Sequence, residues 1–153
     1  MDQIDRRILT ELQRDATLPI VELASRVGLS ASPCWKRVQK LERTGVIIGR
    51  VARVDAQKLG LSLTVLVEVT AMDHSAAWRE AFLDGVRSSP EVMEVLRLGG
   101  DYDYILRVTV PDTQAYDAFY RRFTQAVPLR AVRSSFVMET VHMKASLPLP
   151  EVA

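Results

Sequence analysis

The sequence has a single cysteine, Cys34, and only two histidines, His74 and His142. One cysteine cannot form an internal disulfide or a thiolate cluster, and two distant histidines are too few for a dedicated zinc site. No apolar run approaches the roughly 18 to 20 residues that a membrane-spanning helix needs, and the first residues lack the apolar core of a signal peptide. We therefore expect a cytoplasmic protein with no metal and no cofactor.

The chain also has no large excess of positive or negative residues, since its formal net charge is only +1. The two parts of the chain differ, however. Residues 1–60 carry 11 Lys and Arg against 7 Asp and Glu, whereas residues 61–153 carry 9 against 12. A basic first part suggests contact with a polyanion. A difference of this size is common between domains, so the interpretation needs a motif to support it.

Apolar residues recur at helical spacing in residues 1–60 and predict three helices. The first helix has Asp2 as a candidate N-cap, and the second follows Pro19 and can end at Gly28. The third runs from Ser30, a candidate N-cap, to Arg43. We interpret residues 46–54 as an extended segment that could form a small wing, and residues 55–60 as a linker.

From residue 61 the apolar pattern changes to the period of two that is typical of a half-buried strand. The whole second part, 61–153, then reads as β-α-β-β-α-β, the ferredoxin-like α+β arrangement with two helices on one face of an antiparallel sheet. The other sheet face carries aliphatic residues, which predicts a homodimer with the two sheets packed together. The expected strands are 61–70, 92–98, 104–110 and 132–143, and the expected helices are 75–87 and 113–127.

The second and third helices have the features of a helix-turn-helix. Ala24 is small enough for a close helix crossing, and Gly28 can adopt the left-handed conformation at the turn. On a helical wheel, Cys34 and Val38 face the core, while the opposite face is polar, basic and free of acids. Such a face suits the major groove of DNA, although a polar basic face is more often simply solvated. The candidate DNA-binding residues are Ser30, Ser32, Lys36, Arg37, Gln39, Lys40 and Arg43.

Two further residues of the third helix have alternative interpretations. Cys34 reads as a small core hydrophobe and not as a redox sensor. Trp35 reads as a packing residue, with a contact to the DNA backbone as the alternative.

The motifs of the whole chain resemble the leucine-responsive regulator / asparagine-operon regulator (Lrp/AsnC) family. The residues that carry the resemblance are Ile4-Asp5-Arg6-Arg7-Ile8-Leu9, Val21-Glu22-Leu23-Ala24, Val27-Gly28-Leu29-Ser30, Pro33-Cys34-Trp35-Lys36-Arg37-Val38, Leu41-Glu42, Gly45-Val46-Ile47, Gly100-Asp101-Tyr102-Asp103-Tyr104 and Arg133-Ser134-Ser135-Phe136-Val137-Met138-Glu139.

This resemblance implies a winged helix-turn-helix followed by a ferredoxin-like, RAM/ACT-like ligand-binding domain. It implies a transcription regulator, not an enzyme, that binds double-stranded DNA, assembles from dimers to an octamer, and responds to an amino acid bound where dimers meet. Gly99 departs from the family pattern, where Ser, Thr or Ala is common, and could change the shape of the pocket. The effector-binding positions implied by the family motif are Leu98, Gly100, Asp101, Tyr102, Asp103, Ser134, Ser135 and Phe136.

A narrower resemblance links the chain to the cysteine-responsive branch of the family, which activates cysteine desulfidase and detoxification genes. It implies cysteine as the effector. The residues that carry it are Pro33-Cys34-Trp35-Lys36-Arg37, His74-Ser75, Trp78, Tyr116-Asp117-Ala118-Phe119-Tyr120, Ser134-Ser135-Phe136 and Ser146-Leu147-Pro148.

Two other functions stay open at this point. An architectural, nucleoid-type protein would share the fold but bind DNA with little sequence preference. An enzyme on the sheet face is also conceivable, with Asp101 and Asp103 as the only suggestive pair, but the sequence has no histidine cluster and no nucleophile elbow. The Gly99-Gly100 loop also has two interpretations. It could be a plain turn, or its backbone N–H groups could bind the carboxylate of an amino acid while Asp101 or Asp103 binds the ammonium group.

Overall fold

The computed structural model describes residues 1–149, which form two compact units. The first unit contains Met1–Arg53 together with the described tail, 141–149, and the second is Val54–Thr140. The expected second domain, 61–153, included the tail, whereas by its contacts the described tail, 141–149, groups with the first unit; residues 150–153 lie outside the described part. Within residues 1–149, no helix is both long and apolar enough to cross a membrane.

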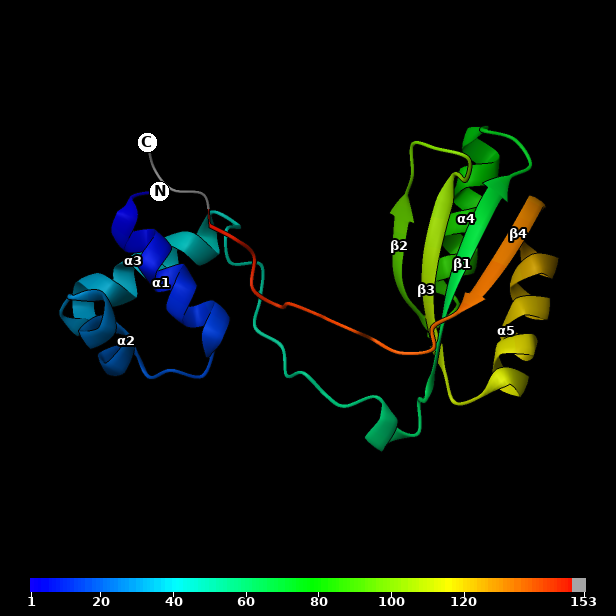
Figure 1. The fold of residues 1–153 in the computed structure, drawn as a ribbon. Coiled ribbons are helices and arrows are strands. Elements are labelled where there is room, and N and C mark those ends of the chain that lie inside the picture. Colours follow the sequence, from blue (N-terminus) through cyan, green and yellow to red (C-terminus); the bar gives the residue numbers. More distant parts are fainter. Residues whose placement is uncertain (150–153) are drawn as a thin grey trace. The chain divides into compact units, whose positions relative to one another are not determined.

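Three helices make up the first unit: α1 (Gln3–Arg14), α2 (Ile20–Val27) and α3 (Ala31–Arg43) (Figure 1). Cys34 and Val38 lie on the buried side of α3, as the wheel predicts, and burial raises the pKa of the Cys34 thiol. A buried, protonated thiol fits the interpretation of Cys34 as a core residue. The core of the unit consists of Ile8, Leu9, Leu23, Ala24, Val27, Cys34, Val38 and Leu41.

The ends of these helices follow local chemistry. The Asp2 carboxylate accepts the N–H of Asp5, and the Asp5 carboxylate accepts the N–H of Asp2, so a reciprocal capping box starts α1. Gly28 ends α2 with φ at 75°, a left-handed conformation that favours glycine. Pro19 is the N-cap of α2 and not its first helical residue.

The predicted wing is not formed. Residues 46–54 contain no strand, and the side chains of Ile48, Val51 and Val54 are exposed. A β-strand needs a partner to satisfy its backbone groups, and none of the described segments of this chain pairs with residues 46–54.

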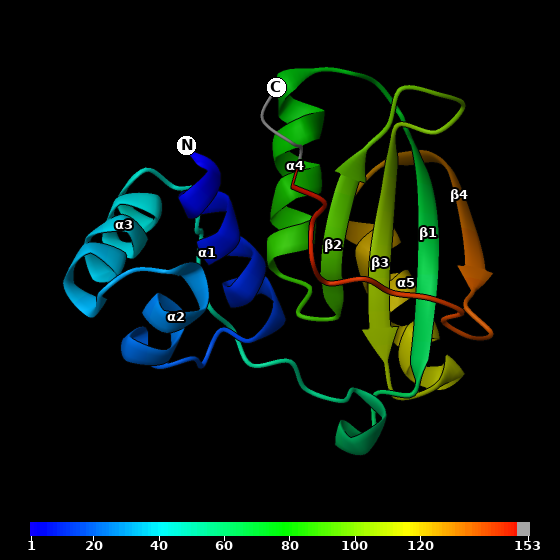
Figure 2. The same cartoon turned by 60° about the vertical axis from the view of Figure 1, so that its left-hand side comes forward.

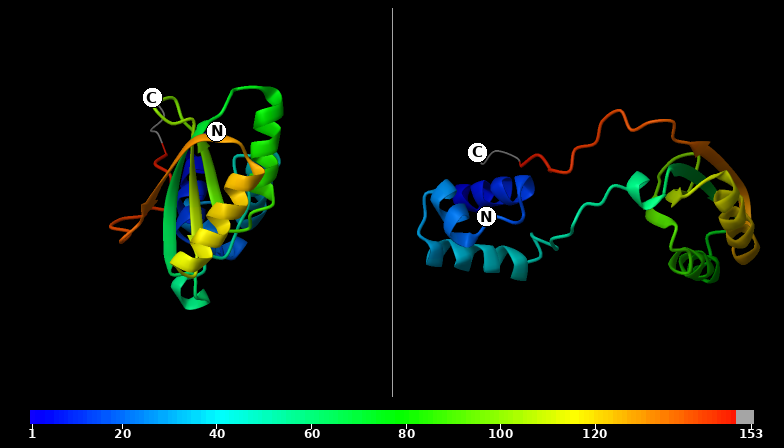
Figure 3. Two further views of the ribbon diagram at one scale, coloured as in Figure 1. Left: turned by 90° about the vertical axis from the view of Figure 1, so that its right-hand side faces the viewer. Right: turned by 90° about the horizontal axis from the view of Figure 1, so that it is seen from below.

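The second unit begins with a short 3-10 helix, η1 (Gln57–Leu59), and is the predicted β-α-β-β-α-β fold. The strands lie in the order β2-β3-β1-β4, and every neighbouring pair is antiparallel (Figure 2). Both long helices cover the same sheet face (Figure 3). The elements are β1 (Leu63–Ala71), α4 (Ala76–Arg87), β2 (Val92–Arg97), β3 (Tyr104–Val110), α5 (Thr113–Ala126) and β4 (Leu129–Phe136).

The core of the second unit lies between the sheet and the two helices. Val65, Val67 and Val69 of β1 are buried, so the period of two gave the correct inward face. Phe82 of α4 and Phe119 of α5 are fully buried against them. This face of the sheet is therefore fully used inside one chain.

The last strand is shifted from its predicted position. β4 covers Leu129–Phe136, not 132–143. Phe136 pairs with Val65, and the N–H of Val137 still donates to the carbonyl oxygen of Thr64 at 2.9 Å. In this register β1 begins, at Leu63, opposite residue 138, so the chain beyond 138 has run past its partner and cannot continue the ladder.

The opposite sheet face has an aliphatic centre and a charged periphery. By strand register, Ile105 of β3 lies opposite Leu96 of β2 and diagonal to Leu66 of β1, on the side away from the helices. Leu66 itself lies opposite Arg107. Two ion pairs, Arg107–Glu94 at 3.0 Å and the longer Arg133–Glu68 at 3.9 Å, flank this centre.

Candidate DNA-binding and effector sites

Helix α3 turns a row of cations outward. Lys36, Lys40 and Arg43 are exposed, and no ion pair within residues 1–149 includes any of them. Ser30 begins the helix without a side-chain cap, the first turn has no acidic residue, and Ser32 is exposed one turn before Lys36. This face is therefore available to an anion.

Arg37 lies differently from the other basic residues of α3. Its Nη1 donates to Asp2 Oδ2 at 2.6 Å and to Asp5 Oδ1 at 2.7 Å, and Asp5 is only 4% exposed. Both carboxylates raise the pKa of the guanidinium. Arg37 thus fastens α3 to the first turn of α1, and we assign it to positioning the helix.

The helical wheel predicted that the exposed face of α3 is free of acids, but Glu42 lies beside it. Gln39 Nε2 donates to Glu42 Oε2 at 3.0 Å, and Glu42 also pairs with Arg50 at 3.0 Å. Gln39 is therefore partly engaged by a neighbour. Trp35 is 53% exposed, so packing does not account for most of its surface.

The loop that joins β2 to β3 carries five of the predicted effector positions, and Asp103 anchors it. Asp103 Oδ2 accepts the N–H of Ala71 at 2.8 Å, and its backbone N–H donates to Val69 O at 2.9 Å. Its other carboxylate oxygen lies 3.9 Å from His74 Nε2. Asp103 therefore has a structural task, whereas Asp101 is exposed and accepts no hydrogen bond from the described residues.

Leu98 and Gly100 lie in the same loop and are exposed, and the backbone N–H of Leu98 donates to Asp103 O at 2.8 Å. The hydroxyl of Tyr102 accepts from Arg133 of β4 at 3.4 Å. The loop is thus linked by one polar contact to β4, the edge strand on the far side of β1.

The three remaining effector candidates lie on β4 and point to different sides. Ser134 faces the helices, where its hydroxyl hydrogen-bonds the hydroxyl of Tyr116 at 2.5 Å. Ser135 pairs with Leu66 and lies on the opposite face. The Phe136 ring contacts the Tyr116 ring edge-on, with centroids 5.6 Å apart.

The predicted effector residues therefore fall into two groups within one chain. The loop is tied to β1 at Val69 and Ala71, whereas Phe136 pairs with Val65. Six residues of extended strand span about 20 Å, so one amino acid cannot reach both Phe136 and the loop of the same chain. A site that uses both groups requires a second copy.

A hollow of about 400 Å³ lies between α5 and β4, and part of its lining is outside the predicted effector positions. Ser134 and Phe136 line it together with Thr113, Tyr116 and Tyr120. The Tyr-x-x-x-Tyr spacing puts both tyrosines on one face of α5, where Tyr116 is buried. Tyr120 is exposed because it lies beside β4, the edge strand of the sheet. The spacing of apolar residues in the sequence does not show this exposure.

The sequence and the fold were compared with known proteins. Residues 1–42 match the AsnC-type helix-turn-helix domain, and residues 64–147 match the Lrp/AsnC ligand binding domain. Together the two matches include α3, the β2–β3 loop and β4.

Full-length relatives agree. The chain is 45% identical over 150 residues to the DNA-binding transcriptional activator DecR of Escherichia coli, which covers 97% of this chain and 99% of that protein. The crystal structure of an AsnC family transcriptional regulator from Agrobacterium tumefaciens superposes with a TM-score of 0.92 at 47% identity, covering 97% of both chains. A transcriptional regulator of Neisseria meningitidis in complex with L-Met gives 0.91 at 32% identity, with 97% and 96% covered. The chain therefore belongs to the Lrp/AsnC family of DNA-binding transcription regulators.

Proposed function

We propose that this regulator recognises a two-fold symmetric DNA site through α3 and changes its DNA affinity when a small amino acid binds. The observation that carries the DNA part is the outward row of Lys36, Lys40 and Arg43, which have no internal partner in the described chain, on a helix that Arg37 holds in place. Lysine and arginine bind phosphates and guanine edges, and serine and glutamine bind base edges. The proposed contact set is Ser30, Ser32, Lys36, Gln39, Lys40 and Arg43.

We propose a homodimer as the DNA-binding unit, in which the free sheet faces pack against each other. The aliphatic centre around Leu66 and Ile105 supports this, because water contact with such a patch is unfavourable. A two-fold axis would present two copies of α3 to two half-sites. We further propose that these dimers assemble to an octamer. We also propose that the protein acts in the cytoplasm, where DNA is accessible.

The proposed effector is an amino acid, with cysteine favoured by the narrower sequence resemblance. The L-Met complex of the Neisseria relative supports an amino acid as the ligand class. Asp101 supplies an exposed carboxylate for an ammonium group, and the N–H groups of Gly99 and Gly100 can receive a carboxylate. Because the loop and Phe136 are too far apart in one chain, we place the site where two dimers meet.

Selection from random-sequence duplex DNA tests this function. We expect the wild-type protein to enrich a symmetric motif and to bind it at least about a thousandfold more tightly than random DNA. L-Cysteine or L-methionine is expected to change that affinity by about fivefold or more. Binding without a motif would favour the architectural alternative, and no binding at moderate salt would contradict the proposal.

A further inference from the structure

The chain passes between its two units twice. It enters the second unit between Arg53 and Val54 and returns to the first between Thr140 and Val141. The match to the ligand-binding family runs to residue 147, although the contacts group residues 141–147 with the helices. A body on one linker can reorient within the reach of that linker, and a second fastened attachment removes much of this freedom.

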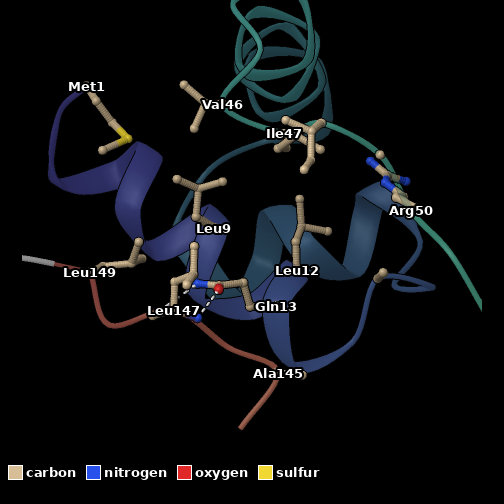
Figure 4. A pocket seen from close by; sticks show the side chains of 13 residues that line it. Met1, Leu9, Leu12, Gln13, Val46, Ile47, Arg50, Ala145, Leu147 and Leu149 are labelled. Carbon is tan, nitrogen blue, oxygen red and sulfur yellow. Dashed lines mark hydrogen bonds between the residues drawn. The ribbon is translucent and has the colours of Figure 1, made fainter. Parts of the chain in front are cut away.

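The second attachment is fastened by the side chain of Gln13. Its Oε1 accepts the backbone N–H of Leu147 at 2.6 Å, and its Nε2 donates to the carbonyl oxygen of the same residue at 3.3 Å (Figure 4). The amide thus binds both polar groups of one peptide residue, as a neighbouring strand would. Glutamine is well suited to this role, because its amide carries a donor and an acceptor side by side.

The apolar contacts of the tail are few. Leu149 packs against the helical core, while the Leu147 side chain is mostly exposed. A hollow of about 390 Å³ remains between the tail, Leu9 and Leu12 of α1, and Ile47 (Figure 4). An attachment made of two hydrogen bonds near the surface and one partly buried side chain can open locally without unfolding the unit.

The tail leaves the basic face of α3 free. The hollow beneath the tail is lined by α1, by residues 46–50 and by the tail itself, and neither Lys36 nor Lys40 belongs to it. The attachment therefore cannot act by covering the DNA-binding residues. It can act on the orientation in which the first unit is held.

We propose that residues 141–149 form a clasp on α1 that orients the DNA-binding unit, so that clasp closure and DNA binding favour each other. Residues 137–140 join the clasp to β4, which carries the proposed effector residues Ser134–Phe136, so the effector site has a second covalent route to the helices. This inference rests on the proposed DNA-binding function. Holding each unit in its binding orientation lowers the ordering cost when DNA binds.

Gln13→Met tests the clasp, because methionine has a similar length and helix propensity but no amide. Gln3→Met is the matched control, because Gln3 is an exposed residue of the same helix whose side chain makes no hydrogen bond within the described chain. Clasp opening is measured in the full-length protein by native trypsin digestion, from the mass of the peptide released after the exposed Lys144. We expect release from Gln13→Met to be about tenfold faster than from wild type, with the control unchanged.

DNA binding is measured with the duplex selected by the wild-type protein. We expect Gln13→Met to bind about three- to thirtyfold more weakly through lost preorganisation, with an unchanged dependence on salt because no phosphate contact is removed. The DNA should also slow release after Lys144 in wild type, as reciprocity requires. Equal release from wild type and variant, or faster release with unchanged DNA affinity, would overturn the clasp. If wild type binds no DNA, the proposed function fails instead, and the release rates still report whether the clasp closes.

Discussion

At the scale of the residue, Asp2 joins helix capping to the placement of α3. Its carboxylate accepts the N–H of Asp5 and the guanidinium of Arg37, and these contacts hold the pKa of Asp2 below its ordinary value of 3.8. A carboxyl group whose pKa is lower in the folded state stabilises the fold at pH values above its unfolded pKa. That stabilisation is lost as the pH falls through the folded pKa, so unfolding takes up a proton in this interval.

We therefore expect Asp2→Asn to weaken the acid dependence of stability. Below about pH 4, the number of protons taken up on unfolding should fall by up to about one. Urea unfolding at a series of pH values gives this number from the slope of the unfolding free energy against pH. Asp101→Asn, which removes an exposed carboxylate without a partner in the described chain, serves as the comparison. An acid limb identical to wild type in Asp2→Asn would show that Asp2 makes no such contribution.

At the scale of the element, helix α3 separates into a positioning side and a contacting side. Arg37 is tied to α1, whereas Lys36 and Lys40 are exposed cations. A lysine that contacts a phosphate releases about one counterion when DNA binds, whatever the base sequence. The two classes of residue therefore differ in how their removal changes the salt dependence of binding.

Lys36→Ala and Lys40→Ala are each expected to weaken binding on all duplexes alike. The slope of log affinity against log salt should fall by about one unit per phosphate contact removed. Fluorescence anisotropy at several salt concentrations measures this slope. Lys58→Ala changes a cation on η1, outside the helical unit, and should leave the slope unchanged. Unchanged slopes in both α3 variants would place the phosphate contacts elsewhere.

At the scale of the whole molecule, the free sheet face decides the assembly. Leu66 lies at its aliphatic centre, and a two-fold axis brings each such residue close to the partner sheet. A charge placed there would be taken out of water twice in every dimer, and Arg107, which lies opposite Leu66, already pairs with Glu94.

We expect Leu66→Glu to weaken dimerisation by at least about a hundredfold, since taking a charge out of water into an apolar interface costs several kcal/mol. Sedimentation velocity over a range of concentrations should then show a shift toward monomer. Leu59→Glu adds the same charge at an exposed position off the sheet and should assemble like wild type. A Leu66→Glu protein with wild-type assembly would mean that the sheets do not form the dimer interface.

Much of the fold follows from local patterns. The period of two in β1, the caps at Asp2 and Gly28, and the buried side of α3 all agree with the structure, because each depends on residues only a few positions apart. The predictions of the wing and of the end of β4 were wrong because neither depends on nearby residues alone. Strand length depends on a partner distant in sequence, and apolar residues such as Ile48 and Val141 look like strand residues whether or not a partner exists.

The sites divide in the same way. The basic face of α3 could be predicted from spacing, but the wheel does not show which cation meets Asp5, so the contact of Arg37 with α1 was not predicted. The family motifs predicted a shared site for Ser134 and Asp103. Ser134 lies on β4 and Asp103 lies in the loop before β3, on opposite sides of β1, and Asp103 accepts the N–H of Ala71. Gln13 and Leu147 lie 134 positions apart and carry no mutual signal.

The amino-acid sequence alone determined the class of protein: three helices with a helix-turn-helix turn, a ferredoxin-like second part, and the motifs of one regulator family. Those features arise from contacts within a turn, a strand or a short motif, where residue type fixes the conformation. Only the tertiary structure decided which charges are paired, where β4 stops, and that the tail joins the helical unit through Gln13. Each of these depends on a partner that is distant in sequence and comes into contact only in the folded molecule.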